Sequence, residues 1–137
     1  MSDVGELRYA VHALVRELRA HRRPTELTET QYAILGGLDR GGPATPAELG
    51  EAHRVRAQTL TPALNALAAD GLVRRRRDDA DRRRQFVELT PAGRAVVEAD
   101  RDARNDWLDS VMDERLTELE RGVLLLAAPV LAKLADG

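Results

Sequence analysis

The sequence has no cysteine among its 137 residues, which excludes a disulfide framework, a thiol redox switch and a cysteine-ligated metal site. It also lacks a long apolar run. The longest mainly apolar stretch, residues 123–131, is too short to span a bilayer. No basic segment followed by an apolar one opens the chain. We therefore expect a cytoplasmic protein that has no membrane partner.

Features that would indicate an enzyme are also missing. The chain has no glycine-rich phosphate loop, no nucleophile paired with a base and no cluster of metal ligands. The three histidines, His12, His21 and His53, are far apart and show no ligand spacing. We expect no catalytic residues, no metal and no cofactor.

Lysine is almost absent, because 20 of the 21 basic residues are arginine and the remaining one is Lys133. The formal net charge is -2, but the charges are unevenly distributed. Residues 71–84 hold seven arginines and three aspartates, whereas residues 98–120 hold nine acidic and three basic residues. This separation predicts one side that faces a polyanion and an acidic far side. Arginine also makes forked contacts with phosphates and guanine that lysine cannot make.

The basic segment and the residues that follow it, 71–89, are predicted to form a β-hairpin. Leu72 and Val73 begin one short strand, and residues 86–89 form a second strand whose apolar residues suit a half-buried face. Thr90 then caps a new helix, with Pro91 in its first turn, where a missing N–H has no cost.

Four helices are expected before the hairpin and two after it. Two of the N-termini carry capping boxes, Thr28 with Gln31 and Thr45 with Glu48. The third helix is short and ends near His53, and a tight turn follows it. The fourth helix ends at Gly71, in the left-handed cap position. The expected helices span residues 4–21, about 28–40, 46–53, about 57–70, about 91–111 and about 113–135.

A short helix, a tight turn, a second helix and a basic hairpin make a winged helix-turn-helix, mainly α with a small two-stranded β-wing. The terminal helices carry more apolar surface than this small domain can cover. We therefore predict a homodimer that presents two recognition helices to a palindromic site on double-stranded DNA. The expected segments are an N-terminal dimerisation helix (1–26), the DNA-binding domain (27–90) and C-terminal dimerisation helices (91–137).

Two motifs give the chain a resemblance to the MarR family of bacterial transcriptional regulators. The first is Leu27-Thr28-x-x-Gln31-x-x-x-Leu35-x-x-Leu38 followed by Thr45-x-x-Glu48-Leu49. The second is Gly71-Leu72-Val73-x-Arg75, then Asp78-x-x-Asp81-Arg82-Arg83, then Leu89-Thr90-x-x-Gly93. The resemblance covers about residues 4–135. It implies an obligate dimer and, usually, repression relieved by a small molecule, such as an aromatic or phenolic effector. Relatives carry an apolar residue at the position of His53, so the resemblance also implies a partly buried core role for this histidine.

The resemblance also assigns roles in the wing and at the effector site. Arg83 enters the minor groove, where Asp81 holds its guanidinium in place, and this arrangement favours A·T-rich flanks. Arg82 and Arg84 either contact phosphates or are exposed wing-tip residues without a DNA contact. The effector pocket of relatives lies between the dimer helices and the DNA-binding domain, and the residues we place near it are His12, Arg16 and Tyr32.

In the fourth helix, Gln58 suits adenine, and the threonines suit phosphates or thymine methyl groups, unless these residues are merely surface polar groups. Arg54 either contacts the DNA backbone or marks a looser turn. Pro62 removes a helix bond unless it lies in the first turn, so we expect the helix to begin late, near Gln58 or Thr59, or to bend. The predicted DNA-binding residues are Arg54, Arg56, Gln58, Thr59, Thr61, Arg75, Asp81, Arg82, Arg83 and Arg84.

Two functions agree with this sequence. One is a sequence-specific regulator, often a repressor, that a small-molecule ligand releases from DNA. The other is a constitutive or architectural DNA-binding protein of the same fold without an effector. The operator and the direction of regulation are not encoded in any motif.

Overall fold

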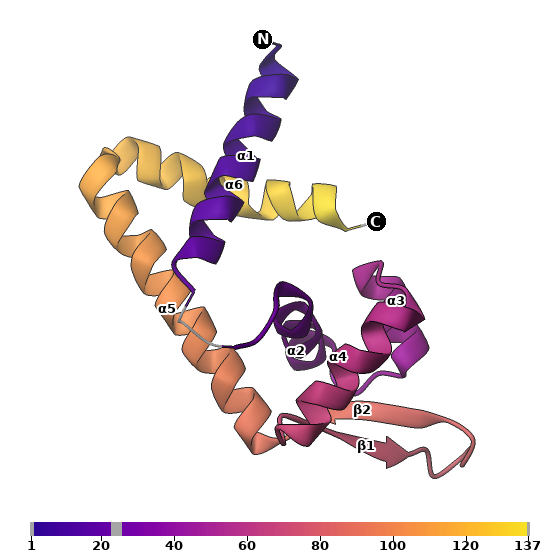
Figure 1. Cartoon of the computed structure of the whole chain (residues 1–137). Helices are drawn as coiled ribbons and strands as arrows, with labels where there is room; N and C mark the ends of the chain where they lie inside the picture. Colours follow the sequence, from indigo (N-terminus) through magenta and orange to yellow (C-terminus); the bar gives the residue numbers. More distant parts are fainter. Residues whose placement is uncertain (1, 23–25, 137) are drawn as a thin grey trace. The chain divides into compact units, whose positions relative to one another are not determined.

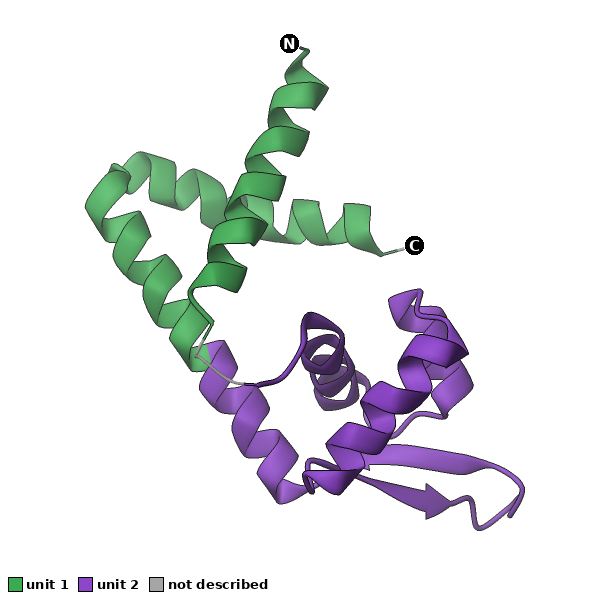
Figure 2. Cartoon of the chain, viewed as in Figure 1, with its two compact units in different colours: residues 1–23, 102–137 green, residues 24–101 purple. Residues whose placement is uncertain are grey.

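The computed structural model describes residues 2–22 and 26–136, which form two compact units (Figures 1 and 2). Unit 2 comprises residues 24–101, and unit 1 comprises residues 1–23 and 102–137. Helix α5 (Pro91–Arg115) belongs to unit 2 up to Arg101 and to unit 1 from Asp102 onward. The predicted segments are 1–26, 27–90 and 91–137. They place the whole of α5 with the C-terminal helices, whereas the two units divide this continuous helix between them.

Unit 2 begins with three helices, α2 (Glu29–Gly41), α3 (Pro46–His53) and α4 (Ala57–Ala69). Both predicted capping boxes are present, and each satisfies backbone donors that a helix N-terminus leaves without partners. Gly42, the C-cap that follows α2, has φ of 78°, and Gly71, which follows α4, has φ of 73°. Both angles lie in the region that glycine adopts without steric cost.

The core of unit 2 forms where these helices pack against the hairpin. Its fully buried side chains come from α2, from α4 and from the second strand of the hairpin, and they are Ile34, Leu35, Leu64, Leu67 and Val87. Leu60, Leu64 and Leu67 lie one and two turns apart, so they form one buried stripe on α4. That stripe fixes which face of α4 remains in solvent.

The hairpin consists of the antiparallel strands β1 (Val73–Arg77) and β2 (Gln85–Leu89), and we call residues 73–89 the wing. Val73 pairs with Leu89, and Arg77 pairs with Gln85. Val87 is fully buried and also bridges to Ala44, which ties the wing to the loop before α3. The Thr90 hydroxyl accepts the Gly93 N–H at 3.1 Å, and α5 begins at Pro91 as predicted.

Unit 1 contains α1 (Asp3–Ala20), the second half of α5 and α6 (Glu118–Ala135). The predicted boundary between the last two helices, near residues 111–113, is wrong. Helix α5 continues to Arg115, and α6 starts only at Glu118, because Thr117 and Glu120 form a third capping box that the prediction overlooked. Trp107 of α5 stacks on His21, with ring centroids 4.4 Å apart.

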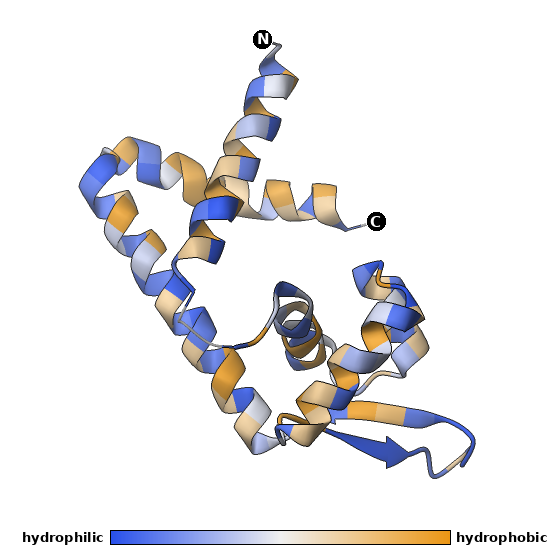
Figure 3. Ribbon diagram, viewed as in Figure 1, coloured by the Kyte–Doolittle hydropathy of each residue, from blue (hydrophilic) through white to orange (hydrophobic). Residues whose placement is uncertain are grey.

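Apolar residues recur along α1 and α6 of unit 1 (Figure 3). Many of their large side chains are exposed. One stripe along α6 has helical spacing and consists of Leu119, Val123, Leu126, Val130 and Leu134. Another exposed set lies on α1 and consists of Val4, Leu7, Val11, Leu14 and Val15.

No helix in the described part of the chain is long and apolar enough to cross a membrane.

Candidate DNA-binding site

Helix α4 turns a polar face to solvent. Gln58, Pro62 and Asn65 lie opposite the buried leucine stripe, and Thr59 and Thr61 flank them. The helix begins at Ala57, where the N–H groups of Thr59 and Leu60 both donate to the carbonyl of Arg56 at 2.9 Å.

The predicted late start of this helix, near Gln58 or Thr59, is therefore wrong, and the alternative, a bend at Pro62, stays a prediction. Pro62 lies inside a continuous helix, and the donor that it lacks would have reached the carbonyl of Gln58. Because Pro62 lies on the exposed face of α4, water can satisfy that carbonyl, and the packing of the leucine stripe holds the helix together.

Arg54 forms the turn between α3 and α4. Its backbone has φ of 53° and ψ of 45°, the left-handed conformation, and its N–H donates to the carbonyl of Glu51 at 3.3 Å. The side chains of Arg54 and Arg56 are exposed, and neither forms a salt bridge within residues 2–22 and 26–136. Both guanidinium groups remain available to an external anion.

The tip of the wing is an ordered loop. The Asp78 carboxylate accepts the Ala80 N–H and the Asp81 carboxylate accepts the Arg83 N–H, both at 3.0 Å. The same Asp81 oxygen lies 3.4 Å from the Arg83 Nε. The Arg83 side chain is nevertheless 94% exposed. The loop thus holds one guanidinium at its base and presents it to solvent.

The other wing arginines differ in their contacts. Arg74 and Arg76 lie 2.8 and 3.5 Å from the two carboxylate oxygens of Glu88, and these contacts, chiefly the Arg74 hydrogen bond, lower the pKa of that carboxyl. Arg84 reaches Glu48 of α3 at 3.5 Å. Arg76 and Arg84 also lie over the Phe86 ring, 5.6 and 5.3 Å from its centroid.

One contact in this region was missed by the sequence analysis. The Arg75 Nη2 of β1 donates to the Asn65 Oδ1 of α4 at 2.7 Å. Asn65 lies seven positions after Gln58, so helical periodicity places both on one face. That spacing could have identified Asn65 as a member of the polar face.

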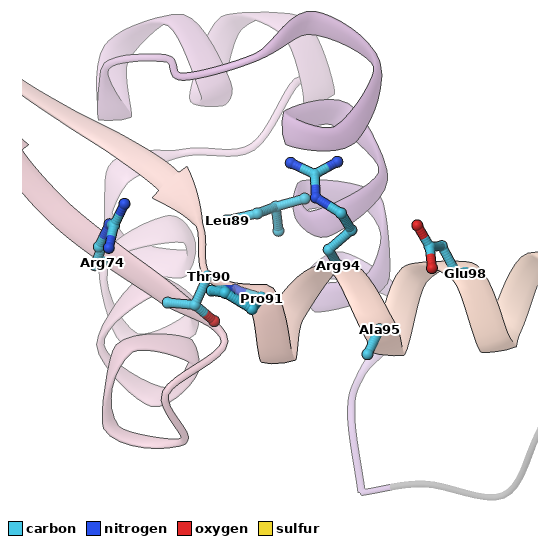
Figure 4. Close-up of a pocket in the computed structure, with 7 residues that line it drawn as sticks. All are labelled: Arg74, Leu89, Thr90, Pro91, Arg94, Ala95 and Glu98. Atoms are coloured by element: carbon cyan, nitrogen blue, oxygen red, sulfur yellow. The ribbon is translucent and has the colours of Figure 1, made fainter.

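A cavity of about 360 Å³ lies where the wing meets α5, and Figure 4 shows Arg74, Arg94 and Glu98 around it. The Arg94 guanidinium bonds to Asp39 of α2 at 3.1 Å, and Asp39 also pairs with Arg101. Because Arg74 pairs with Glu88, both cations at this cavity are already matched by carboxylates. These ion pairs join β1 to β2 and α5 to α2. The two arginines that line the cavity are therefore not left unmatched for an external anion.

The three residues predicted near an effector belong to different units. His12 and Arg16 are exposed on α1 in unit 1, whereas Tyr32 is buried in α2 of unit 2. His12 lines a largely apolar cavity of about 410 Å³ between α1 and α6. The other residues lining this cavity are Val4, Leu7, Arg8, Val11, Leu131, Leu134 and Ala135.

His53 is partly buried, as predicted, and its ring lies against the backbone of Gly37. A Cβ at position 37 would lie 2.5 Å from the His53 Nε2. Burial, aided by the nearby Arg40 cation, lowers the pKa of His53. Within the described residues, no group of three or more His, Asp or Glu side chains is placed to hold a metal ion.

The lowered pKa of His53 predicts acid-dependent stability. As pH falls below about 6.5, the unfolded chain binds a proton at this residue before the folded chain does. The free energy of unfolding should therefore fall with pH until the folded state is also protonated. Urea unfolding between pH 7.5 and 5 measures this slope, and His53→Gln should reduce it. An unchanged slope in that variant would exclude His53 as the source.

Helices α2 to α4 followed by the two-stranded wing define a winged helix-turn-helix protein. A family model described as "MarR family" matches residues 25–84. The chain is 34% identical to the HTH-type transcriptional regulator Mb0904 of Mycobacterium bovis, over 96% of this chain and 92% of that protein. It is 30% identical to the multiple antibiotic resistance protein MarR of Salmonella typhimurium, over 88% of this chain and 85% of that protein.

Two solved structures are also similar. A crystal structure of a transcriptional regulator from Pseudomonas aeruginosa has a TM-score of 0.86 and 34% identity, and the match covers 98% of this chain and 93% of that one. The other is Bordetella bronchiseptica BpsR, whose DNA binding is regulated by 6-hydroxynicotinic acid. It has a TM-score of 0.68 and 26% identity, over 99% of this chain and 94% of that one.

The chain belongs to the MarR family of transcriptional regulators. Its function is DNA-binding transcriptional regulation.

Proposed function

We propose that the protein is a homodimeric repressor that binds a palindromic operator and is released from it by a small molecule. The observation that carries this proposal is the wing tip, where Asp81 anchors Arg83 and leaves its side chain 94% exposed. A guanidinium held at its base loses less conformational entropy when it enters a narrow groove. The negative potential of an A·T-rich minor groove attracts such a cation.

The second half of the proposed interface is the exposed face of α4, which lies in the major groove. Gln58 is the side chain suited to adenine, and Thr59 and Thr61 contact phosphates or thymine methyl groups. Arg54 and Arg56 at the start of the helix, and Arg82 and Arg84 near the wing tip, contribute phosphate contacts. Phosphate contacts make the affinity fall steeply as salt is added.

Dimerisation in this proposal uses the exposed apolar surfaces of α1 and α6. Solvation of these large side chains is unfavourable in a monomer, and each leucine that becomes fully buried contributes roughly 1.5–3 kcal/mol. Two copies of α4 then fit successive major grooves of a palindrome. The exposed apolar side chains of α1 and α6 are therefore the main support for a dimer.

The effector proposal rests on BpsR and on the cavity beside His12. The cavity is lined by apolar side chains together with His12 and Arg8, which suits a small aromatic acid. Val4, Leu7 and Val11 belong both to this lining and to the apolar surface proposed for the dimer, so in this proposal the effector binds beside the dimer contact. Arg16 and Tyr32 remain further candidates for effector contacts. A thermal-shift screen of hydroxylated aromatic acids tests the proposal, because an effector raises the apparent melting temperature by mass action. A true effector must also lower operator affinity, and His12→Ala should weaken both effects.

Arg83→Ala should weaken operator binding by about 1–3 kcal/mol per wing, because it removes the anchored groove contact. Arg82→Ala is the matched control, since Arg82 is its exposed neighbour and forms no salt bridge among the described residues. Fluorescence anisotropy with operator duplex measures both. Equal losses in the two variants would show that the wing acts through charge alone and would remove Arg83 from the groove.

A further inference from the structure

Helix α4 carries no charged residue between Ala57 and Ala69. Its exposed polar side chains are the amides of Gln58 and Asn65 and the hydroxyls of Thr59 and Thr61. A recognition helix of this kind has no guanidinium of its own with which to read guanine, although arginine with guanine is the commonest specific contact in the major groove.

The wing supplies a guanidinium to this helix. Arg75 reaches from β1 to the second half of α4, where its Nη2 lies 2.7 Å from the Asn65 Oδ1. An arginine side chain only donates hydrogen bonds, so the oxygen of the Asn65 amide must face it. This fixes the orientation of the amide and turns its NH₂ group away from Arg75. Both residues are exposed.

Asn65 also lies at the right distance from Gln58 to read a separate base pair. The two residues are seven positions apart on one helix face, a rise of about 10 Å. Successive base pairs are about 3.4 Å apart, so the two side chains face positions about three base pairs from each other.

We propose that Asn65 and Arg75 act as one base-reading element whose preferred base is guanine. The inference rests on the proposed function, since it requires α4 to lie in the major groove. One lone pair of the Asn65 oxygen is occupied by Arg75, so the pair presents mainly N–H donors: the Asn65 NH₂ group and the remaining N–H groups of Arg75. Guanine offers two acceptors in the major groove, N7 and O6, whereas adenine offers one acceptor and a donor.

In the test, the full-length protein selects duplexes from a random pool. Its affinity is then measured for the most enriched duplex and for single-base variants of that duplex. The variants are Asn65→Ala, Arg75→Ala and the double variant. Asp70→Asn, at the exposed C-cap of the same helix, is the control. Because Asn65 and Arg75 are on the surface, circular dichroism should show the same fold in every variant.

We expect the wild type to favour guanine over adenine at one position of each half-site by about tenfold or more. Each single substitution should reduce that ratio to about twofold or less, the double variant should reduce it no further, and the control should keep it. A purely structural role would lower affinity for every duplex equally and leave the ratio unchanged.

The proposal is overturned if Asn65→Ala keeps every base preference of the wild type. It is also overturned if the preference lost in that variant is for a base other than guanine. A wild type that enriches no sequence would instead contradict the proposed function itself, so the two failures are distinguishable.

Discussion

Leu126→Asp is expected to convert the proposed dimer into monomers and to lower operator affinity by about a hundredfold or more. Leu126 is 77% exposed and lies in the middle of the apolar stripe of α6. A carboxylate placed there would be buried without a partner in the dimer interface, which is strongly unfavourable. The monomer loses nothing comparable, because the same carboxylate would be solvated.

The large effect on DNA binding follows from the loss of bivalency. Two linked DNA-binding domains gain roughly 10²–10⁴ in overall affinity over one domain, and a monomer forfeits this gain. Sedimentation velocity reports the oligomeric state, and anisotropy reports affinity. Ser110→Asp is the control, because it adds the same charge at an exposed polar position of α5, outside the apolar surfaces of α1 and α6. A Leu126→Asp variant that still sediments as a dimer would show that α6 is not the interface.

Gly93→Ala is expected to destabilise the fold by about 3 kcal/mol and to lower the melting temperature by about 10 °C. A Cβ at this position would lie 2.0 Å from the carbonyl oxygen of Leu72, which is a backbone atom. That oxygen accepts the Thr90 N–H at 3.1 Å, and the Thr90 side chain also bonds to the carbonyl of Gly71. The added methyl group would therefore disturb the junction that joins α4, the wing and α5.

Gly41→Ala is the control for this prediction. Gly41 is the last residue of α2, is exposed and has no atom within 4 Å of the position that a Cβ would occupy. Alanine is the better helix former, so this variant should raise the free energy of unfolding by less than about 1 kcal/mol. Calorimetry compares the two variants. Similar melting temperatures would mean that the Gly93 junction can relax without cost.

Local signals in the sequence were enough to predict most of the fold. Thr28, Thr45 and Thr90 each precede a helix, and capping depends only on residues within one turn, so it is readable without tertiary information. The wing was predicted for the same reason, because strand alternation and the cap that follows it are local. The MarR family resemblance is confirmed by the family model and by the relatives.

The errors arose where a local rule competed with packing. Proline normally ends or delays a helix, but Pro62 faces solvent while Leu60, Leu64 and Leu67 bury the other face and hold α4 continuous. The α5–α6 boundary was misplaced because the Thr117 cap lies within a run of helix-forming residues. The contact between Asn65 and Arg75 was overlooked because the two residues are ten positions apart, one on a helix and one on a strand, and no local pattern reports such a contact.

The candidate site residues remain predictions, since their roles depend on bound DNA. Exposure of the α4 face and of Arg83 agrees with a DNA-contacting role, but the base that each side chain meets depends on how the duplex bends and how wide its grooves are. The effector residues were the hardest to predict, because a pocket is formed by several elements whose packing no single motif encodes.

The most direct test of the central claim is binding of the wild-type protein to the promoter DNA flanking its own gene, across a salt series, with a scrambled duplex as control. A sequence-specific regulator should favour the promoter duplex by about a thousandfold or more. Equal affinities that fall together as salt is added would mean phosphate contacts alone. That result would contradict specific regulation of this promoter and favour an architectural role.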